Sequence, residues 1–138
     1  MKQLHVEAST YCNARCPLCP RNVFGYKVEG VYPEVNLSVE KFKKALDRFP
    51  ERHLVYFNGN LGDPMMNPDI VELVKCTQCH TAITTNGSIG SKQTWQDLAK
   101  QHVEVRFSID GLEDTNHLYR QDVQWSKVMD RVKWFIDA

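Results

Sequence analysis

Four short apolar segments alternate with four amphipathic segments along the 138 residues, and this alternation most constrains the fold. The apolar segments 4–8, 53–57, 81–84 and 103–110 are predicted strands. Each is followed by a predicted helix, and the helix caps are Ser38, Asn67 with Pro68, Ser91 and Ser126. Strands that alternate with helices favour a parallel sheet with right-handed crossovers. The chain is therefore predicted to be one α/β domain.

Glycine and small polar residues gather where the four predicted strands end, in the segments 11–21, 58–64, 84–88 and 108–111. Ligands of parallel α/β sheets bind at the carboxyl ends of the strands. The last strand alternates strictly, with Val103, Val105, Phe107 and Ile109 on one face and Glu104, Arg106, Ser108 and Asp110 on the other. Its polar face would line a ligand-filled interior or simply be solvated. Together the four ends predict one polar ligand that lies across them.

Three cysteines, Cys12, Cys16 and Cys19, fall within eight residues in a Cys-x3-Cys-x2-Cys pattern. Thiolates select iron–sulfur clusters, zinc or copper(I). A structural zinc site and an ordinary four-iron cluster both take four protein ligands. Three cysteines would leave one iron of a cluster open to another ligand. A zinc loop and three unrelated thiols are the alternatives.

The cysteine loop, Gly62-Asp63-Pro64, the run 84–87 and the run 108–111 resemble, in that order, the core of the radical S-adenosylmethionine (radical SAM) enzymes. They look most like the branch of peptide and sulfatase maturases and cofactor-biosynthesis enzymes. The resemblance implies a partial TIM-like barrel, with about four parallel βα units of a (β/α)6 core. An eight-unit barrel takes about 250 residues, so 138 residues would supply roughly four units. Residues 1–138 are thus expected to be a radical SAM core domain truncated after its fourth unit.

The resemblance also implies roles for individual residues. Cys12, Cys16 and Cys19 would ligate a [4Fe-4S] cluster. Gly62 and Asp63 match the turn that receives the methionine amino group, with aspartate where glutamate is commoner. The other residues implied to bind S-adenosylmethionine are Leu18 (where an aromatic residue usually meets the adenine), Thr85 (near the methionyl moiety), Ser108 and Asp110 (near the ribose and carboxylate), and Arg120 (a carboxylate-binding arginine).

The activity implied by the resemblance is reductive cleavage of S-adenosylmethionine to a 5′-deoxyadenosyl radical that abstracts a hydrogen from a substrate. The chemistry would belong to the cofactors, and no acid–base residue is nominated. The implied partners are an external electron donor and a peptide or small-molecule substrate. The family core has six strands, so the missing C-terminal strands are expected from the rest of the chain or from another chain. The isolated chain is accordingly expected to bind its cluster weakly, to aggregate and to be nearly inactive.

A second cysteine pair, Cys76 and Cys79 followed by His80, matches the attachment pattern of c-type haem. These residues could instead be half a zinc site, ligands of a second cluster, or ordinary thiols at a helix end. Two other classes of function therefore stay open. One is a non-catalytic zinc or cluster-binding module in which Cys76, Cys79 or His80 supplies a fourth ligand to the first three cysteines. The other is a haem electron carrier.

Lysine plus arginine equals aspartate plus glutamate, 17 each, so bulk charge suggests neither nucleic acid nor membrane as a partner. No apolar run is long enough to span a bilayer, and the first residues lack the apolar core of a signal peptide. The protein is therefore predicted to be cytoplasmic. In a reducing compartment, five cysteines favour metal ligands or free thiols over disulfides.

Overall fold

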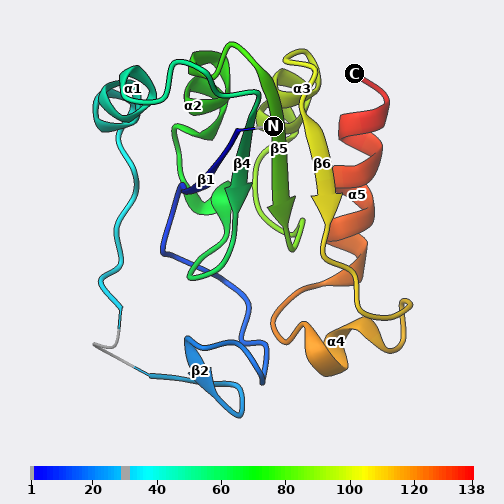
Figure 1. Ribbon diagram of the computed structural model, residues 1–138. Helices are drawn as coiled ribbons and strands as arrows, with labels where there is room; N and C mark the ends of the chain where they lie inside the picture. Colours follow the sequence, from blue (N-terminus) through cyan, green and yellow to red (C-terminus); the bar gives the residue numbers. More distant parts are fainter. Residues whose placement is uncertain (1, 29–31) are drawn as a thin grey trace.

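A parallel sheet of four strands forms the centre of the computed structural model, which describes residues 2–28 and 32–138. The strands β1 (Gln3–Glu7), β4 (Leu54–Asn58), β5 (His80–Thr85) and β6 (Glu104–Phe107) lie side by side in that order. All four point the same way, toward the lower end of the molecule in Figure 1. The predicted parallel α/β sheet is confirmed, although the last strand ends three residues earlier than expected.

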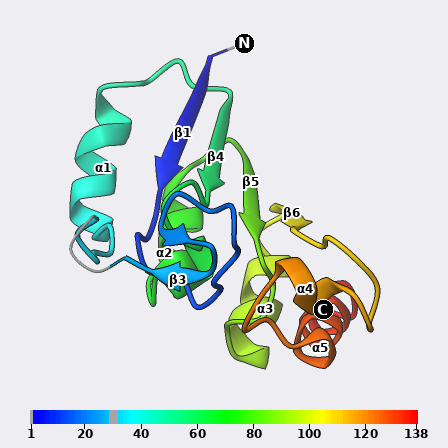
Figure 2. The ribbon, with the colours of Figure 1, turned by 90° about the horizontal axis from the view of Figure 1, so that it is seen from below.

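Four helices, α1 (Val39–Asp47), α2 (Ile70–Cys76), α3 (Lys92–Ala99) and α5 (Trp125–Ile136), follow the strands and cover one face of the sheet (Figures 1 and 2). The residues of the strands that point to this face are mostly apolar, with Thr81 and Thr85 as buried polar exceptions. The core that results includes Val55, Phe57 and Ile83 from the sheet and Phe42, Leu73, Trp95 and Leu98 from the helices.

The serine caps at the starts of α1 and α3 are confirmed. Ser38 accepts a hydrogen bond from the Lys41 amide, and Ser91 accepts one from the Thr94 amide. These bonds satisfy amide groups that a helix start leaves without partners.

The predicted starts of the other two helices are wrong. Asn67 forms a turn before α2, because its Oδ1 accepts from the Asp69 amide and its Nδ2 donates to the carbonyl oxygen of Ala8. The helix proper begins at Ile70. Ser126 lies inside the first turn of α5, whose N-cap is Gln124. Ile136, the last residue of α5, is 73% exposed.

The sequence did not predict several short elements. These are the hairpin of β2 (Asn22–Val23) and β3 (Tyr26–Lys27), the 3-10 helix η1 (Pro64–Met66), and the helix α4 (Asn116–Tyr119). The hairpin and α4 lie below the strand ends in Figure 1, on either side of the cysteine loop. They therefore flank the edge of the sheet at which a ligand was predicted.

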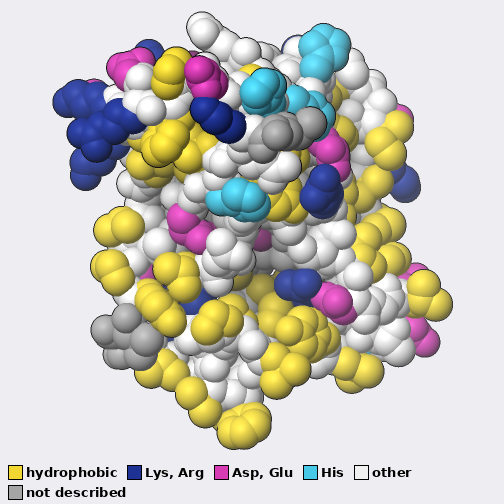
Figure 3. All heavy atoms as spheres, viewed as in Figure 1, with side chains coloured by type: hydrophobic (Ala, Val, Ile, Leu, Met, Phe, Trp, Pro, Cys, Tyr) yellow, Lys and Arg dark blue, Asp and Glu magenta, His cyan; other side chains and the backbone are white. Residues whose placement is uncertain are grey.

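The other face of the sheet carries polar side chains and is not covered by the helices (Figure 3). The strand register places His5, Tyr56 and Glu104 in one row across this face, and Arg106 lies beside Thr84 in the next row. Arg106 donates to Glu104 at 2.6 Å and to the Tyr56 hydroxyl at 3.1 Å. The predicted polar face of the last strand is thus present, although Ile109 on the apolar side is 40% exposed.

None of the helices in the described part of the chain is both long and apolar enough to cross a membrane.

Candidate functional site

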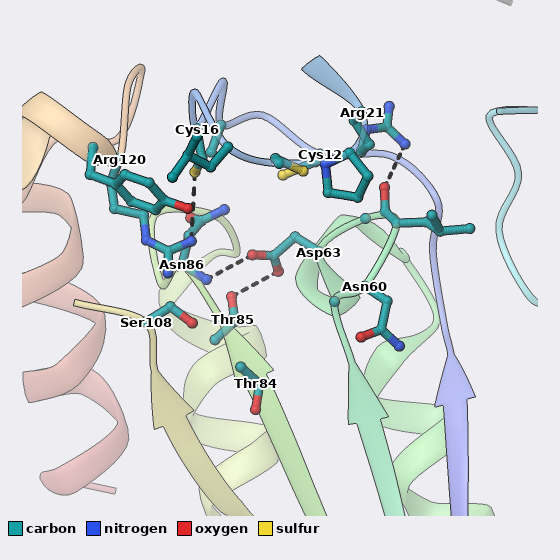
Figure 4. A pocket seen from close by; sticks show the side chains of 18 residues that line it. Cys12, Cys16, Arg21, Asn60, Asp63, Thr84, Thr85, Asn86, Ser108 and Arg120 are labelled. Atoms are coloured by element: carbon teal, nitrogen blue, oxygen red, sulfur yellow. Dashed lines mark hydrogen bonds between the residues drawn. The ribbon is translucent and has the colours of Figure 1, made fainter. Parts of the chain in front are cut away.

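A cavity of about 460 Å³ lies where the four strand ends meet the cysteine loop (Figure 4). Its lining includes every residue of the predicted site except Asp110. The lining residues are Cys12, Ala14, Cys16, Leu18, Cys19, Pro20, Arg21, Gly59, Asn60, Leu61, Gly62, Asp63, Thr84, Thr85, Asn86, Ser108, Tyr119 and Arg120. The structure therefore brings together residues that lie as far as a hundred positions apart in the sequence.

The cysteine loop is tied to the strand ends by two polar side chains of its own. Asn13 donates to Ser88 Oγ at 2.8 Å and accepts from Asn86 Nδ2 at 2.9 Å, which joins the loop to the end of β5. Arg21 is buried and donates to the carbonyl oxygens of Thr10 and Leu61, which joins the loop to the segment after β4. These bonds hold the cysteines over the cavity.

Gly62 is the point of closest approach between the cysteine loop and the segment after β4. A Cβ atom at this position would lie 2.1 Å from the carbonyl oxygen of Ser9 and 2.7 Å from that of Tyr11. The next amide, of Asp63, donates to the Tyr11 carbonyl at 2.8 Å. From β1, the Glu7 carboxylate accepts from the Leu61 and Gly62 amides at 3.3 and 3.2 Å. The glycine is thus needed for the close packing of the two chain segments.

Asp63 is buried at the base of the cavity and joins the ends of β4 and β5. Its Oδ1 accepts from the Thr85 hydroxyl at 2.7 Å and from the Met65 amide at 2.9 Å, and its Oδ2 accepts from the Asn86 amide at 2.8 Å. Burial raises the pKa of this carboxyl, and these hydrogen bonds oppose the rise. The side chains of Asp63 and Thr85 therefore stabilise each other.

All three cysteines of the loop are free thiols that line the cavity. Burial, together with the nearby Asp63 carboxylate, raises the pKa of the Cys12 thiol to about 11. Burial also raises the pKa of Cys16, against the opposing effect of the Arg120 guanidinium. Within residues 2–28 and 32–138, no three His, Cys, Asp or Glu side chains converge on a point that could hold a single ion. A cluster does not require that convergence, because each thiolate binds a different iron. Three thiols around one cavity fit such a cluster.

The remaining predicted residues stand around the same cavity in different ways. Leu18 lies on the rim and is 79% exposed, which leaves an apolar surface at the opening. Ser108 follows β6, and its amide donates to the Thr85 carbonyl at 2.8 Å. Arg120 reaches the cavity from the end of α4 and donates to the carboxylate of Asp110. Asp110 thus does not line the cavity itself, but it holds the Arg120 side chain that does.

The second cysteine pair lies at the opposite end of the sheet. Cys76 ends α2, and Cys79 precedes His80, the first residue of β5. Since the cysteine loop lies beyond the last residues of the parallel strands, Cys76, Cys79 and His80 are distant from Cys12, Cys16 and Cys19. This placement opposes the hypothesis that they complete a zinc site with the loop.

Sequence reasoning missed the tethering side chains. Asn13 and Arg21 belong to the cysteine loop, but no pattern in the sequence indicates which carbonyl or amide group they contact. Asn86 stands in a recognised motif, and its role as the partner of Asn13 follows only from the fold.

The model of the radical SAM superfamily matches residues 6–138, nearly the whole chain. The chain belongs to the radical SAM superfamily. The predicted family is thereby confirmed, and with it the expectation of a radical SAM enzyme domain.

A curated relative from Pyrococcus furiosus is the tungsten-containing aldehyde ferredoxin oxidoreductase cofactor-modifying protein. It is 34% identical over 119 residues, which cover 81% of this chain and 32% of the relative. This radical SAM chain therefore spans about a third of the length of the relative.

Solved radical SAM structures share the fold. SuiB of Streptococcus suis bound to S-adenosylmethionine has a TM-score of 0.76 at 22% identity, over 98% of this chain and 31% of SuiB. Native anSMEcpe with bound AdoMet has a TM-score of 0.73 at 21% identity, over 98% and 40% of the two chains. Methylornithine synthase has a TM-score of 0.68 at 16% identity, over 98% and 41%. The four-stranded parallel sheet of this chain thus corresponds to part of the barrel of the radical SAM enzymes.

Proposed function

We propose that this domain binds a [4Fe-4S] cluster and S-adenosylmethionine, and that it cleaves the latter reductively to start a radical reaction on a substrate. The observation that carries the proposal is the cavity lined by Cys12, Cys16 and Cys19 on one side and by the polar ends of β4, β5 and β6 on the other. Membership of the radical SAM superfamily supports it, as do similar structures that were solved with bound S-adenosylmethionine.

The three thiolates would hold three irons, which leaves the fourth for S-adenosylmethionine. When bound, the two cofactors would supply the chemistry, a one-electron reductive cleavage of the sulfonium that would yield methionine and a 5′-deoxyadenosyl radical able to take a hydrogen atom from the substrate.

The protein would then bind and orient the cofactors. The Gly62–Asp63 turn lies beside the cysteine loop, where the amino group of S-adenosylmethionine would be received. Ser108 and Arg120 line the wall of the cavity that β6 and α4 provide. Leu18 would contribute apolar contact at the rim.

The substrate is proposed to be a peptide or a small molecule. Relatives of both kinds support this choice: SuiB was solved with a precursor peptide, and the P. furiosus relative is named as a cofactor-modifying protein. We also infer a cytoplasmic setting, since a reducing compartment keeps the thiols available for iron.

The test is anaerobic reconstitution with iron and sulfide, followed by dithionite and S-adenosylmethionine. The expected results are iron and labile sulfide in equal amounts, at up to four atoms each per chain, and a small amount of 5′-deoxyadenosine from the isolated chain. Zinc in place of iron, after loading with both metals, would favour the alternative of a non-catalytic zinc module. A cluster with no 5′-deoxyadenosine would leave an iron–sulfur protein without the proposed reaction.

A further inference from the structure

Arg120 makes a direct contact with a cysteine of the loop. Its Nη1 lies 3.6 Å from Cys16 Sγ, in the geometry of an N–H···S hydrogen bond (Figure 4). Cys16 is 6% exposed and the Arg120 side chain 22%, so the contact is mostly shielded from water. A shielded contact between a cation and a sulfur is stronger than the same contact in solvent.

The fold around Arg120 holds the guanidinium in this position. Its Nε donates to Asp110 Oδ2, and the Asp110 amide in turn donates to Asn116 Oδ1 at 3.0 Å. Asn116 is buried, and its carbonyl accepts from the Arg120 amide at 2.8 Å. The arginine is thus anchored through both its side chain and its backbone. Its contact with Cys16 is built into the segment between β6 and α5.

The hydrogen bonds that a cluster's sulfur atoms accept are one of the terms that set its reduction potential. A reduced cluster carries one more negative charge than an oxidised one. A cationic donor on a ligand sulfur therefore stabilises the reduced state more than the oxidised state. Arg120 supplies both the N–H group and the positive charge to Cys16.

We propose that Arg120 is a positioning residue that raises the reduction potential of the cluster through its hydrogen bond to Cys16 Sγ. The step concerned is the transfer of one electron from an external reductant to the cluster, in which no covalent bond forms or breaks. The inference rests on the proposed function, because it needs the cluster. It is separate from the carboxylate-binding role that the family resemblance implies for Arg120, since it acts before S-adenosylmethionine is present.

A second ion pair between the same two segments provides a matched control. Arg15 of the cysteine loop pairs with Asp122 just beyond Arg120, and the Arg15 amide donates to the Gln121 carbonyl at 3.0 Å. Both members of this pair are about half exposed. Removal of the Arg15 side chain loosens the same junction without taking a donor from a cysteine sulfur.

The experiment is a potentiometric titration of the reconstituted protein without S-adenosylmethionine, followed by electron paramagnetic resonance. Arg120→Gln should lower the midpoint potential by at least the equivalent of a tenfold change in the one-electron equilibrium, about 59 mV. Arg120→Lys, which keeps the charge, should restore part of that shift. Arg15→Gln should leave the potential unchanged.

Iron content and urea stability, measured on all the variants, separate tuning from a merely structural role. A wild type that carries its cluster and forms 5′-deoxyadenosine, with an unchanged potential in Arg120→Gln, would overturn this inference alone. Equal shifts in Arg120→Gln and Arg15→Gln would also overturn it, because they would reflect a loosened junction. A wild type without an iron–sulfur cluster would overturn the proposed function as well.

Discussion

The sheet has cysteines near both of its ends, and the two groups have different surroundings. At the carboxyl end, Cys12, Cys16 and Cys19 line a cavity that three neighbouring strands enclose with polar residues. At the amino end, Cys76 and Cys79 flank the connection between α2 and β5, and both pack in part against the hydrophobic core.

The polar groups at the two ends of the sheet also differ in the partners that they contact. At the amino end, Arg52 donates to the carbonyls of Leu46, Phe49 and Thr77, and the hydroxyls of Thr77 and Thr81 pair at 2.6 Å. Those groups close helix ends and satisfy one another. At the carboxyl end, buried groups such as Asp63 and Arg21 brace a loop whose thiols face a cavity. The comparison teaches that a cysteine motif has to be judged together with its surroundings, because only the cysteine loop lies against the polar ends of the strands.

The largest expected effect is that of replacing the cysteines, and it tests whether the two ends of the sheet differ in iron binding. Cys12→Ala, Cys16→Ala and Cys19→Ala should each reduce bound iron to almost none, because two thiolates cannot hold the cluster against solvent. Cys76→Ala and Cys79→Ala should leave iron and sulfide unchanged. Metal analysis after anaerobic reconstitution measures both groups. Loss of iron from the second group and not the first would reverse the roles of the two ends.

Gly62→Val should have the next largest effect. From its match to the family turn, the sequence predicts that a side chain at Gly62 weakens binding of S-adenosylmethionine while the cluster persists. The structure adds the backbone of Ser9 and Tyr11 at less than 3 Å from an added Cβ, so the substitution should also displace the cysteine loop. We expect a loss of about 1–3 kcal/mol in the free energy of unfolding and reduced iron content.

Urea denaturation and iron analysis of Gly62→Val check this expectation. Asn60→Ala, in the same segment but at an exposed position, is the control that should keep both stability and iron. Full iron occupancy in Gly62→Val would show that the loop tolerates the displacement, and would restrict the role of Gly62 to ligand binding.

The elements that the sequence predicted best are those specified by local patterns. The strands and the Ser38 and Ser91 caps follow from apolar periodicity and from a serine hydroxyl close to its own helix start. The three cysteines follow from their spacing, and the meeting of the strand ends follows from parallel topology. Asn67 was misread because its amide found partners at the Ala8 and Leu37 carbonyls, far away in sequence. The contacts of Arg21 and Arg120 depend on the folded chain in the same way, so no local pattern could reveal them.

Asp63→Ala should destabilise the carboxyl end of the sheet without removing a thiol. It would leave the Thr85 hydroxyl and the Asn86 amide buried without their partner, at a cost of about 1–3 kcal/mol. Thr81→Val at the amino end of the same strand is the control, with an expected cost of roughly 1 kcal/mol from loss of the Thr77 partner. Both variants should unfold at lower urea concentration, but only Asp63→Ala should also lower the retention of iron. Equal iron retention would show that the cysteine loop does not depend on the Asp63 network.

Ser108→Ala should have the smallest effect, and it isolates ligand binding from folding. The Ser108 amide is held by the Thr85 carbonyl, while its hydroxyl makes no hydrogen bond to a protein group in the part of the chain that the structure describes. Its loss should therefore leave stability and cluster content unchanged.

One hydrogen bond to a ligand contributes about 0.5–1.5 kcal/mol, so the loss of the Ser108 hydroxyl corresponds to a roughly two- to twelvefold weaker affinity. Titration of the cluster's electron paramagnetic resonance signal with S-adenosylmethionine measures that affinity, and Thr81→Val again serves as the variant from the opposite end. An unchanged titration in Ser108→Ala would remove this hydroxyl from the site, because no structural contact of the hydroxyl in the described chain would be left to mask its effect.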